Sequence, residues 1–223
     1  MPSTETWWTG EIDWSCPAGR LLERFLNALP KDRTFRLTVY GSAPLQLTVD
    51  RQLLSGDVDL FSDEDEDLSA WVKAAHLDNT HGGLYLEAGF ELSFHTSPRW
   101  RRRAKMIQRG QVTITIPHPL DILMGKLDRL EAKDLKAFER VLQLTGHPTA
   151  IEFRQELQNA VDLFRPAFDD ESPNRYPENT RRLWREIFHS YIDVRRDIIE
   201  PAMARRKQGY GESPPDYKAI LGQ

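Results

Sequence analysis

Val39-Tyr40-Gly41-Ser42-Ala43 and Gly56-Asp57-Val58-Asp59-Leu60-Phe61 are the two stretches that decide how the N-terminal half of this chain should fold. The first predicts the end of an apolar strand followed by a Gly-Ser turn. The second begins fourteen residues after Ser42 and predicts another strand. Because strand side chains alternate in direction, Asp57 and Asp59 should leave the same face, with Cα atoms roughly 6.6 Å apart.

Two carboxylates on one face of a buried strand repel each other, and ionising both there is costly unless a positive charge lies between them. A divalent metal ion is the simplest such charge. With oxygen ligands alone and no His or Cys beside Asp57 and Asp59, the site suits Mg²⁺ or Mn²⁺.

A third carboxylate is expected from the region around Gly89. Residues 84–86 and 90–96 predict two strands of a hairpin, and the polar face of the second strand carries Glu91 and His95. Glu91 could therefore complete a metal-binding trio with the two aspartates. A surface glutamate without ligand role explains Glu91 equally well, and His95 is expected to be a hydrogen-bonded or exposed histidine.

Composition points to an ordinary water-exposed protein. The 223 residues include 39% hydrophobic and 29% charged residues, and the net charge of −4 argues against a surface that coats nucleic acid. Cys16 is the single cysteine, so no internal disulfide can form. Neither a signal sequence nor an apolar run of membrane-spanning length is present, and we therefore expect a cytoplasmic protein with no membrane partner.

The periodicity of apolar residues predicts an α+β fold in two parts. Residues 1–117 should form a mixed sheet flanked by helices, and residues 118–223 a helical subdomain. Strands are expected at residues 35–40, 57–61, 84–86, 90–96 and 111–116. Helices are expected from a Ser15 cap to Leu29 and at residues 43–49, 68–77, 119–130, 134–144, 151–164 and 180–200, the last of which Pro201 should kink or end.

One basic cluster stands out, formed by Arg99, Arg101, Arg102, Arg103, Lys105 and Arg109. Guanidinium groups match phosphate oxygens, and Trp100 inside the cluster could offer a stacking face, so the cluster favours a phosphate-rich partner. A solvated loop that neutralises the nearby acidic run at residues 63–67 is the alternative interpretation.

In order and approximate spacing, Gly41-Ser42 and Asp57-Val58-Asp59 resemble the nucleotidyltransferase superfamily typified by DNA polymerase beta. The chain is similar, more narrowly, to the abortive-infection type toxin nucleotidyltransferases and their uncharacterised relatives. These add a lysine motif and then an aspartate motif, which here correspond to residues 126–130 and 134–138. The resemblance covers roughly residues 35–145.

The resemblance implies an enzyme that transfers a nucleoside monophosphate from a nucleoside triphosphate to an acceptor hydroxyl. Asp57 and Asp59 would hold two magnesium ions about 3.5–4 Å apart, and Gly41 and Ser42 would contact the triphosphate. Lys126 would neutralise triphosphate charge. Asp134 would orient Lys126 or the acceptor, or act as a base.

The partners that the resemblance implies are a nucleoside triphosphate and, for a toxin, an antitoxin protein. The acceptor could be RNA, such as the end of a transfer RNA, held by Arg99, Arg101, Arg102 and Arg103, and a protein or small-molecule acceptor stays open. The alternative function is a catalytically degenerate protein of the same fold that binds a nucleotide or a partner. A plain nucleic-acid-binding module is a third hypothesis, and it rests on the arginines alone.

Overall fold

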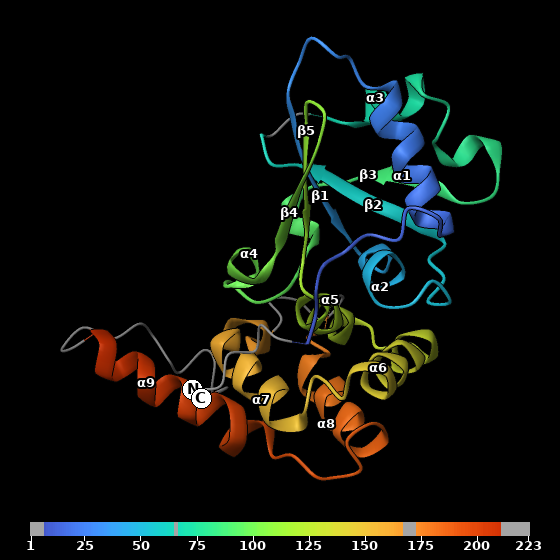
Figure 1. Ribbon diagram of the computed structural model, residues 1–223. Coiled ribbons are helices and arrows are strands. Elements are labelled where there is room, and N and C mark those ends of the chain that lie inside the picture. Colours follow the sequence, from blue (N-terminus) through green and yellow to red (C-terminus); the bar gives the residue numbers. More distant parts are fainter. Residues whose placement is uncertain (1–6, 65–66, 167–172, 211–223) are drawn as a thin grey trace. The chain divides into compact units, whose positions relative to one another are not determined.

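The computed structural model describes residues 7–64, 67–166 and 173–210. It has an α+β fold, in which a five-stranded mixed sheet with helices forms the N-terminal part and a mainly helical region follows (Figure 1). The predicted fold class is therefore confirmed.

The sheet has the strand order β3-β2-β1-β5-β4. Pairs β1–β2 and β4–β5 are antiparallel, whereas β1–β5 and β2–β3 are parallel. The strands are β1 (Phe35–Tyr40), β2 (Asp57–Ser62), β3 (Tyr85–Ala88), β4 (Lys105–Arg109) and β5 (Val112–Ile116). Strand β4 lies in the basic cluster, where no strand was expected. The register places Tyr40 opposite Asp59 and Asp59 opposite Glu87.

Apolar side chains on one face of the sheet form the main core with the helices of the N-terminal part. Val58 and Leu60 of β2 point into this core and are fully buried, as strand alternation requires. The helices are α1 (Pro17–Ala28), α2 (Ala43–Thr48), α3 (Ser69–Ala74) and the short α4 (Trp100–Arg103). The cap of α1 is Cys16 and not the predicted Ser15, because the Cys16 sulfur accepts the amide of Gly19.

The C-terminal part begins with α5 (Pro119–Gly125) and the 3₁₀ turn η3 (Lys126–Asp128). It continues through α6 (Ala132–Thr145), α7 (Ala150–Asn159), η4 (Val161–Phe164), α8 (Tyr176–Glu186), the π-helical turn η5 (Arg195–Ile199) and α9 (Glu200–Tyr210). None of the helices in the described residues is long and apolar enough to cross a membrane.

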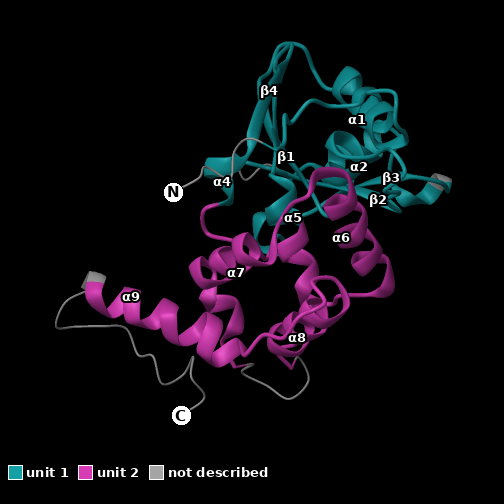
Figure 2. Ribbon diagram, turned by 60° about the horizontal axis from the view of Figure 1, so that its bottom comes forward, with its two compact units in different colours: residues 1–94, 100–122 teal, residues 95–99, 123–223 magenta. Residues whose placement is uncertain are grey.

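The chain divides into two compact units, which Figure 2 shows in different colours. Unit 1 comprises residues 1–94 and 100–122, and unit 2 comprises residues 95–99 and 123–223. The division falls within α5, five residues beyond the boundary expected at residue 117.

Two predicted elements are wrong. Residues 180–200 are not one helix, because α8 ends at Glu186 and His189 adopts a φ of 48°, which an α-helix does not allow. Pro201 does not end a helix either, since residues 194–210 are continuously helical through η5 and α9. Residues 90–96 are not a strand: η1 (Asn79–His81) precedes β3, and the turn η2 (Glu91–Ser93) follows it.

Candidate metal centre

Three carboxylates meet at neighbouring strands of unit 1. Asp57 and Asp59 lie on β2, Glu87 lies on β3, and one oxygen of each lies within 4.8 Å of the others. The parallel pairing of β2 with β3 brings them together, because it places Glu87 opposite Asp59. The aspartates are half-buried and Glu87 is exposed. The predicted aspartate pair thus shares one face of the sheet with an acid that the sequence analysis did not single out.

The turn after β1 lies directly against this acidic cluster of Asp57, Asp59 and Glu87. Gly41 adopts a φ of 68°, and a Cβ on Gly41 would lie 1.9 Å from Oδ2 of Asp59. Only glycine fits both the conformation and the space. Ser42 follows and precedes α2 without capping that helix through its side chain. The structure therefore brings the predicted Gly-Ser turn and the predicted aspartates into one site.

Tyr85 adds an aromatic ring beside the acids. It lies opposite Asp57 in the sheet, and its hydroxyl donates to Oε2 of Glu87 at 3.5 Å. The negative charge of Asp57, with smaller effects of burial and Glu87, raises the pKa of Tyr85. The phenol therefore stays protonated and can donate to the acidic cluster at neutral pH.

Tyr40, opposite Asp59, forms the inner wall of the site. Burial, and after it the charge of Asp59, raises the pKa of Tyr40 to about 12. The Tyr40 hydroxyl lies close to the backbone of Gly89, because a Cβ added to Gly89 would lie 2.0 Å from the hydroxyl oxygen. Gly89 therefore contacts Tyr40 closely, and it does not form the turn of the predicted hairpin.

The cluster is chemically suited to a hard divalent cation. Three carboxylates are concentrated at one place, their oxygens are the ligands that Mg²⁺ and Mn²⁺ prefer, and such ions reduce the mutual repulsion of the acids. Gly41, which has no side chain, leaves room for the Asp59 carboxylate to lie directly against the turn. The donor set and the closeness of the three carboxylates fit a magnesium or manganese ion.

Glu91 does not join this cluster. It lies in η2, where the amide of Phe94 bonds to its carbonyl, and its carboxylate pairs with Nη2 of Arg101 at 3.0 Å. Phe90 and Leu92, expected in a core, are 71% and 87% exposed. The alternation over residues 90–96 was too short a signal to distinguish a strand from a 3₁₀ turn. His95 is exposed, as expected, with Nδ1 4.0 Å from Asp128.

Unit 2 holds the other two predicted catalytic residues, and they form an ion pair. Nζ of Lys126 lies 3.1 Å from Oδ1 of Asp134, and both side chains are buried. The second oxygen of Asp134 accepts hydrogen bonds from Nε of Arg129 at 3.2 Å and from the backbone amide of Glu131 at 3.0 Å. The bond from Glu131 is also part of the capping box at the start of α6. Asp134 therefore fixes the Lys126 ammonium, which is one of the roles expected for it.

The pair changes the pKa of each partner. Burial lowers the pKa of Lys126, although the charge of Asp134 opposes this effect. Burial alone would raise the pKa of Asp134, but Lys126 and the hydrogen bonds from Arg129 and Glu131 outweigh it and lower that pKa. At neutral pH the carboxylate is therefore ionised, with the ammonium of Lys126 as its buried partner.

The arginines of the basic cluster have different roles in the structure. Arg103 forms a two-point contact with the fully buried carboxylate of Asp121, at 2.6 and 3.0 Å. Arg101 pairs with Asp63 at 3.2 Å and with Glu91. Arg99, in unit 2, and Arg102, in unit 1, are exposed. Two of the four arginines expected to contact RNA thus hold carboxylates of unit 1.

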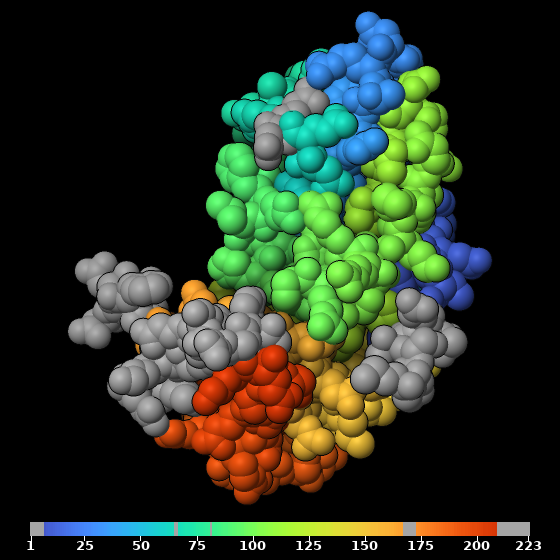
Figure 3. Space-filling model, turned by 90° about the vertical axis from the view of Figure 1, so that its left-hand side faces the viewer, coloured from blue at the N-terminus to red at the C-terminus, as the bar shows by residue number. Residues whose placement is uncertain are grey.

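Trp100 does not offer a stacking face. It is 6% exposed and packs edge-on against Phe61 and Phe94, whose ring centroids lie 6.4 and 5.4 Å away. This aromatic cluster holds the segment after β3 against the sheet. The residues of this segment are among the green atoms in Figure 3.

Comparison of the chain with models of protein families, with curated proteins and with solved structures finds no match.

Proposed function

We propose that this chain is a metal-dependent nucleotidyltransferase, which moves a nucleoside monophosphate from a nucleoside triphosphate to an acceptor hydroxyl. One observation carries the proposal: three carboxylates on adjacent strands, Asp57, Asp59 and Glu87, meet beside the backbone of the Gly41 turn. A fold alone does not imply a function, whereas a group of side chains with suitable chemistry does point to one.

Asp57, Asp59 and Glu87 would hold magnesium or manganese. When bound, the metal would supply positive charge that neutralises the phosphates and favours loss of the acceptor proton. The oxygens of Asp59 and Glu87 face each other across paired strands, so their positions are set by the sheet and not by flexible loops. Such rigid placement suits phosphoryl-type transfer, in which positioning and charge neutralisation provide most of the catalysis.

Gly41 and Ser42 would contact the triphosphate. Because Gly41 has no side chain, the turn packs directly against the Asp59 carboxylate, so phosphates held at Gly41 and Ser42 would lie close to a metal bound by the acids. The hydroxyl and amide of Ser42 can donate to phosphate oxygens. In the transfer, the acceptor oxygen forms a bond to the α-phosphorus and the bond from that phosphorus to the bridging oxygen breaks. Pyrophosphate leaves, and the hydroxyl proton passes to water.

The role of Lys126 as a triphosphate ligand stays a prediction of the resemblance, as do a toxin function and an antitoxin partner. Asp134 fixes the position of the Lys126 side chain by an ion pair at 3.1 Å. RNA contact through Arg99 and Arg102 also stays a prediction.

Incubation of the protein with each α-labelled nucleoside triphosphate, Mg²⁺ and total RNA tests the proposal. We expect label to enter RNA with the wild type and not with the Asp57→Asn, Asp59→Asn double variant. The matched control is Glu11→Gln, Asp32→Asn, which removes two exposed acids elsewhere in unit 1. No transfer to RNA, to the protein itself or to small molecules by the folded wild type would reject the proposal in favour of a catalytically degenerate binder.

A further inference from the structure

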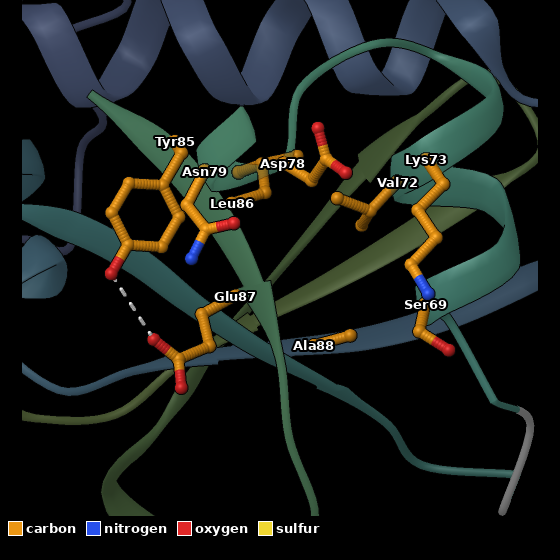
Figure 4. Close-up of a pocket in the computed structure, with 9 residues that line it drawn as sticks. All are labelled: Ser69, Val72, Lys73, Asp78, Asn79, Tyr85, Leu86, Glu87 and Ala88. Carbon is orange, nitrogen blue, oxygen red and sulfur yellow. Dashed lines mark hydrogen bonds between the residues drawn. The ribbon is translucent and has the colours of Figure 1, made fainter. Parts of the chain in front are cut away.

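A hollow of about 210 Å³ lies at the outer edge of β3, and Glu87 is one of the residues that line it (Figure 4). We call it the edge hollow, and its polar lining residues are Ser69, Lys73, Asp78, Asn79, Tyr85 and Glu87. All its residues belong to unit 1, and Glu87 belongs both to the hollow and to the acidic cluster. A molecule bound in the hollow would therefore lie beside the proposed metal.

The strand order of the sheet places the parts of the site in a row. Gly41 follows β1, the aspartates lie on β2, Glu87 lies on β3, and β3 is the edge strand that borders the hollow. The proposed triphosphate contacts at Gly41 and Ser42 lie at one end of this row and the edge hollow at the other. Phosphoryl-type transfer places the attacking and leaving oxygens roughly in line on opposite sides of phosphorus. The hollow is thus at the end from which an acceptor would approach.

The side chains around the hollow match the parts of one nucleotide. Tyr85 offers an aromatic ring, and bases stack on such rings irrespective of sequence. Asn79 lies beside that ring in Figure 4, and its carboxamide can both donate to and accept from a base edge. Lys73, on α3, supplies an ammonium at the side of the hollow away from Tyr85, where a phosphate could bind.

The size of the hollow limits what enters it. Pockets that enclose a whole drug-sized ligand have volumes of about 300–1,000 Å³, and the edge hollow is smaller. It suits one terminal unit of a larger molecule. A duplex end with both strands paired would not present a free base to Tyr85.

We propose that the edge hollow binds the unpaired terminal nucleotide of a nucleic-acid acceptor, with its base on Tyr85 and Asn79 and its phosphate near Lys73. The proposal rests on the proposed function, because it gives the acceptor hydroxyl of that reaction its place beside Glu87. The transferred nucleotide would then extend a single-stranded end.

Binding without turnover tests this proposal. The probes are AMP, CMP, GMP and UMP and a single-stranded RNA tetranucleotide, each titrated without triphosphate or metal while backbone amide NMR shifts are recorded. In the wild type we expect the largest shifts at residues 73, 79 and 85. Tyr85→Ala should weaken binding about tenfold or more, because base stacking is lost, whereas Tyr85→Phe should retain it. Asn79→Ala should reduce discrimination among the four bases.

The control is Tyr191→Ala, which removes an exposed tyrosine of unit 2 and should change nothing. Repeating the titration with Asp57→Asn, Asp59→Asn separates this proposal from the proposed function, since the hollow should still bind while transfer is lost. Probe affinities unaffected by Tyr85→Ala in a folded protein would overturn the assignment of the hollow. So would label transfer that ends on a protein side chain and never on RNA.

Discussion

Gly41 and Asp59 touch across the first two strands of the sheet, so closely that a Cβ on Gly41 would lie 1.9 Å from Oδ2 of Asp59. The turn that follows β1 and the second aspartate of β2 therefore form one unit of structure. A single methyl group at residue 41 would disturb the acidic cluster without removing any of its acids.

Gly41→Ala should impair the site more than its fold. The positive φ costs about 1–2 kcal/mol for a residue with a Cβ, and the clash must displace the Asp59 carboxylate. We expect loss of Mn²⁺ binding, measured by calorimetry, with a modest fall in stability. Gly110→Ala is the control, since its φ is 58° but open space surrounds it. Equal Mn²⁺ affinity in the two variants would contradict the contact.

Removal of acidic charge should have opposite effects with and without metal. In metal-free buffer, Asp57→Asn or Asp59→Asn should leave stability unchanged or raise it by up to about 1 kcal/mol, since repulsion at close range is of that order in water. At a Mn²⁺ concentration a hundred times its Kd, only the wild type should gain about 2.7 kcal/mol. Thermal unfolding with and without Mn²⁺ measures both effects, and an equal gain in the variants would place the metal elsewhere.

The buried ion pair of unit 2 should stabilise the fold whether or not Lys126 binds a phosphate. Asp134→Ala leaves the Lys126 ammonium buried without its carboxylate, and such losses cost about 3–5 kcal/mol. The Lys126→Met, Asp134→Ala double variant should lose much less than the sum of the two single variants. Urea denaturation measures these values, and simple additivity would show that the two residues do not interact.

Acid should remove the contribution of Asp134. Its folded-state pKa lies below the ordinary value of 3.8, so the unfolded chain binds the proton more tightly and the stabilisation is complete above the unfolded-state pKa. It should disappear as the pH falls below 3.8 and through the folded-state pKa. The stability difference between wild type and Asp134→Asn should therefore be constant from pH 5 to 7 and shrink in more acidic buffer. A difference that grew towards low pH would refute this sign.

Arg103 should matter for stability and Arg102 should not. Arg103→Ala leaves Asp121, which is fully buried, without its two-point partner, and we expect a loss of about 3–5 kcal/mol. Arg102→Ala changes an exposed side chain and should stay within about 0.5 kcal/mol of the wild type. Chemical denaturation of the two variants provides the comparison, and similar stabilities would show that the Asp121 contact is weak.

Local sequence signals were sufficient for the aspartates and the glycine turn. The strands around Tyr40 and Asp59 follow from apolar alternation, and the turn between them follows from Gly41. The acid that completes the cluster depends on β2 pairing in parallel with β3, a long-range contact that periodicity does not encode. One signal was available: extending the expected strand at residues 84–86 by one residue would have put Tyr85 and Glu87 on one face.

Longer-range packing also decided the elements that were wrong. The segment after Gly89 turns because Tyr40 fills the space beside that glycine and Phe94 packs on Trp100. The helical pattern at residues 180–200 continues in sequence although α8 ends at Glu186 and His189 adopts a positive φ. Sequence periodicity shows which residues prefer a core, and it does not show where the chain must turn to reach that core.

Two differently labelled samples of the same nucleoside triphosphate decide whether this site performs nucleotidyl transfer. The protein is incubated with Mg²⁺ and RNA, with the label on the α-phosphate in one reaction and on the γ-phosphate in the other. We predict that α-label enters RNA, that γ-label appears only in pyrophosphate, and that Asp59→Asn abolishes both. Entry of γ-label into the acceptor, or equal transfer by Asp59→Asn, would refute the account.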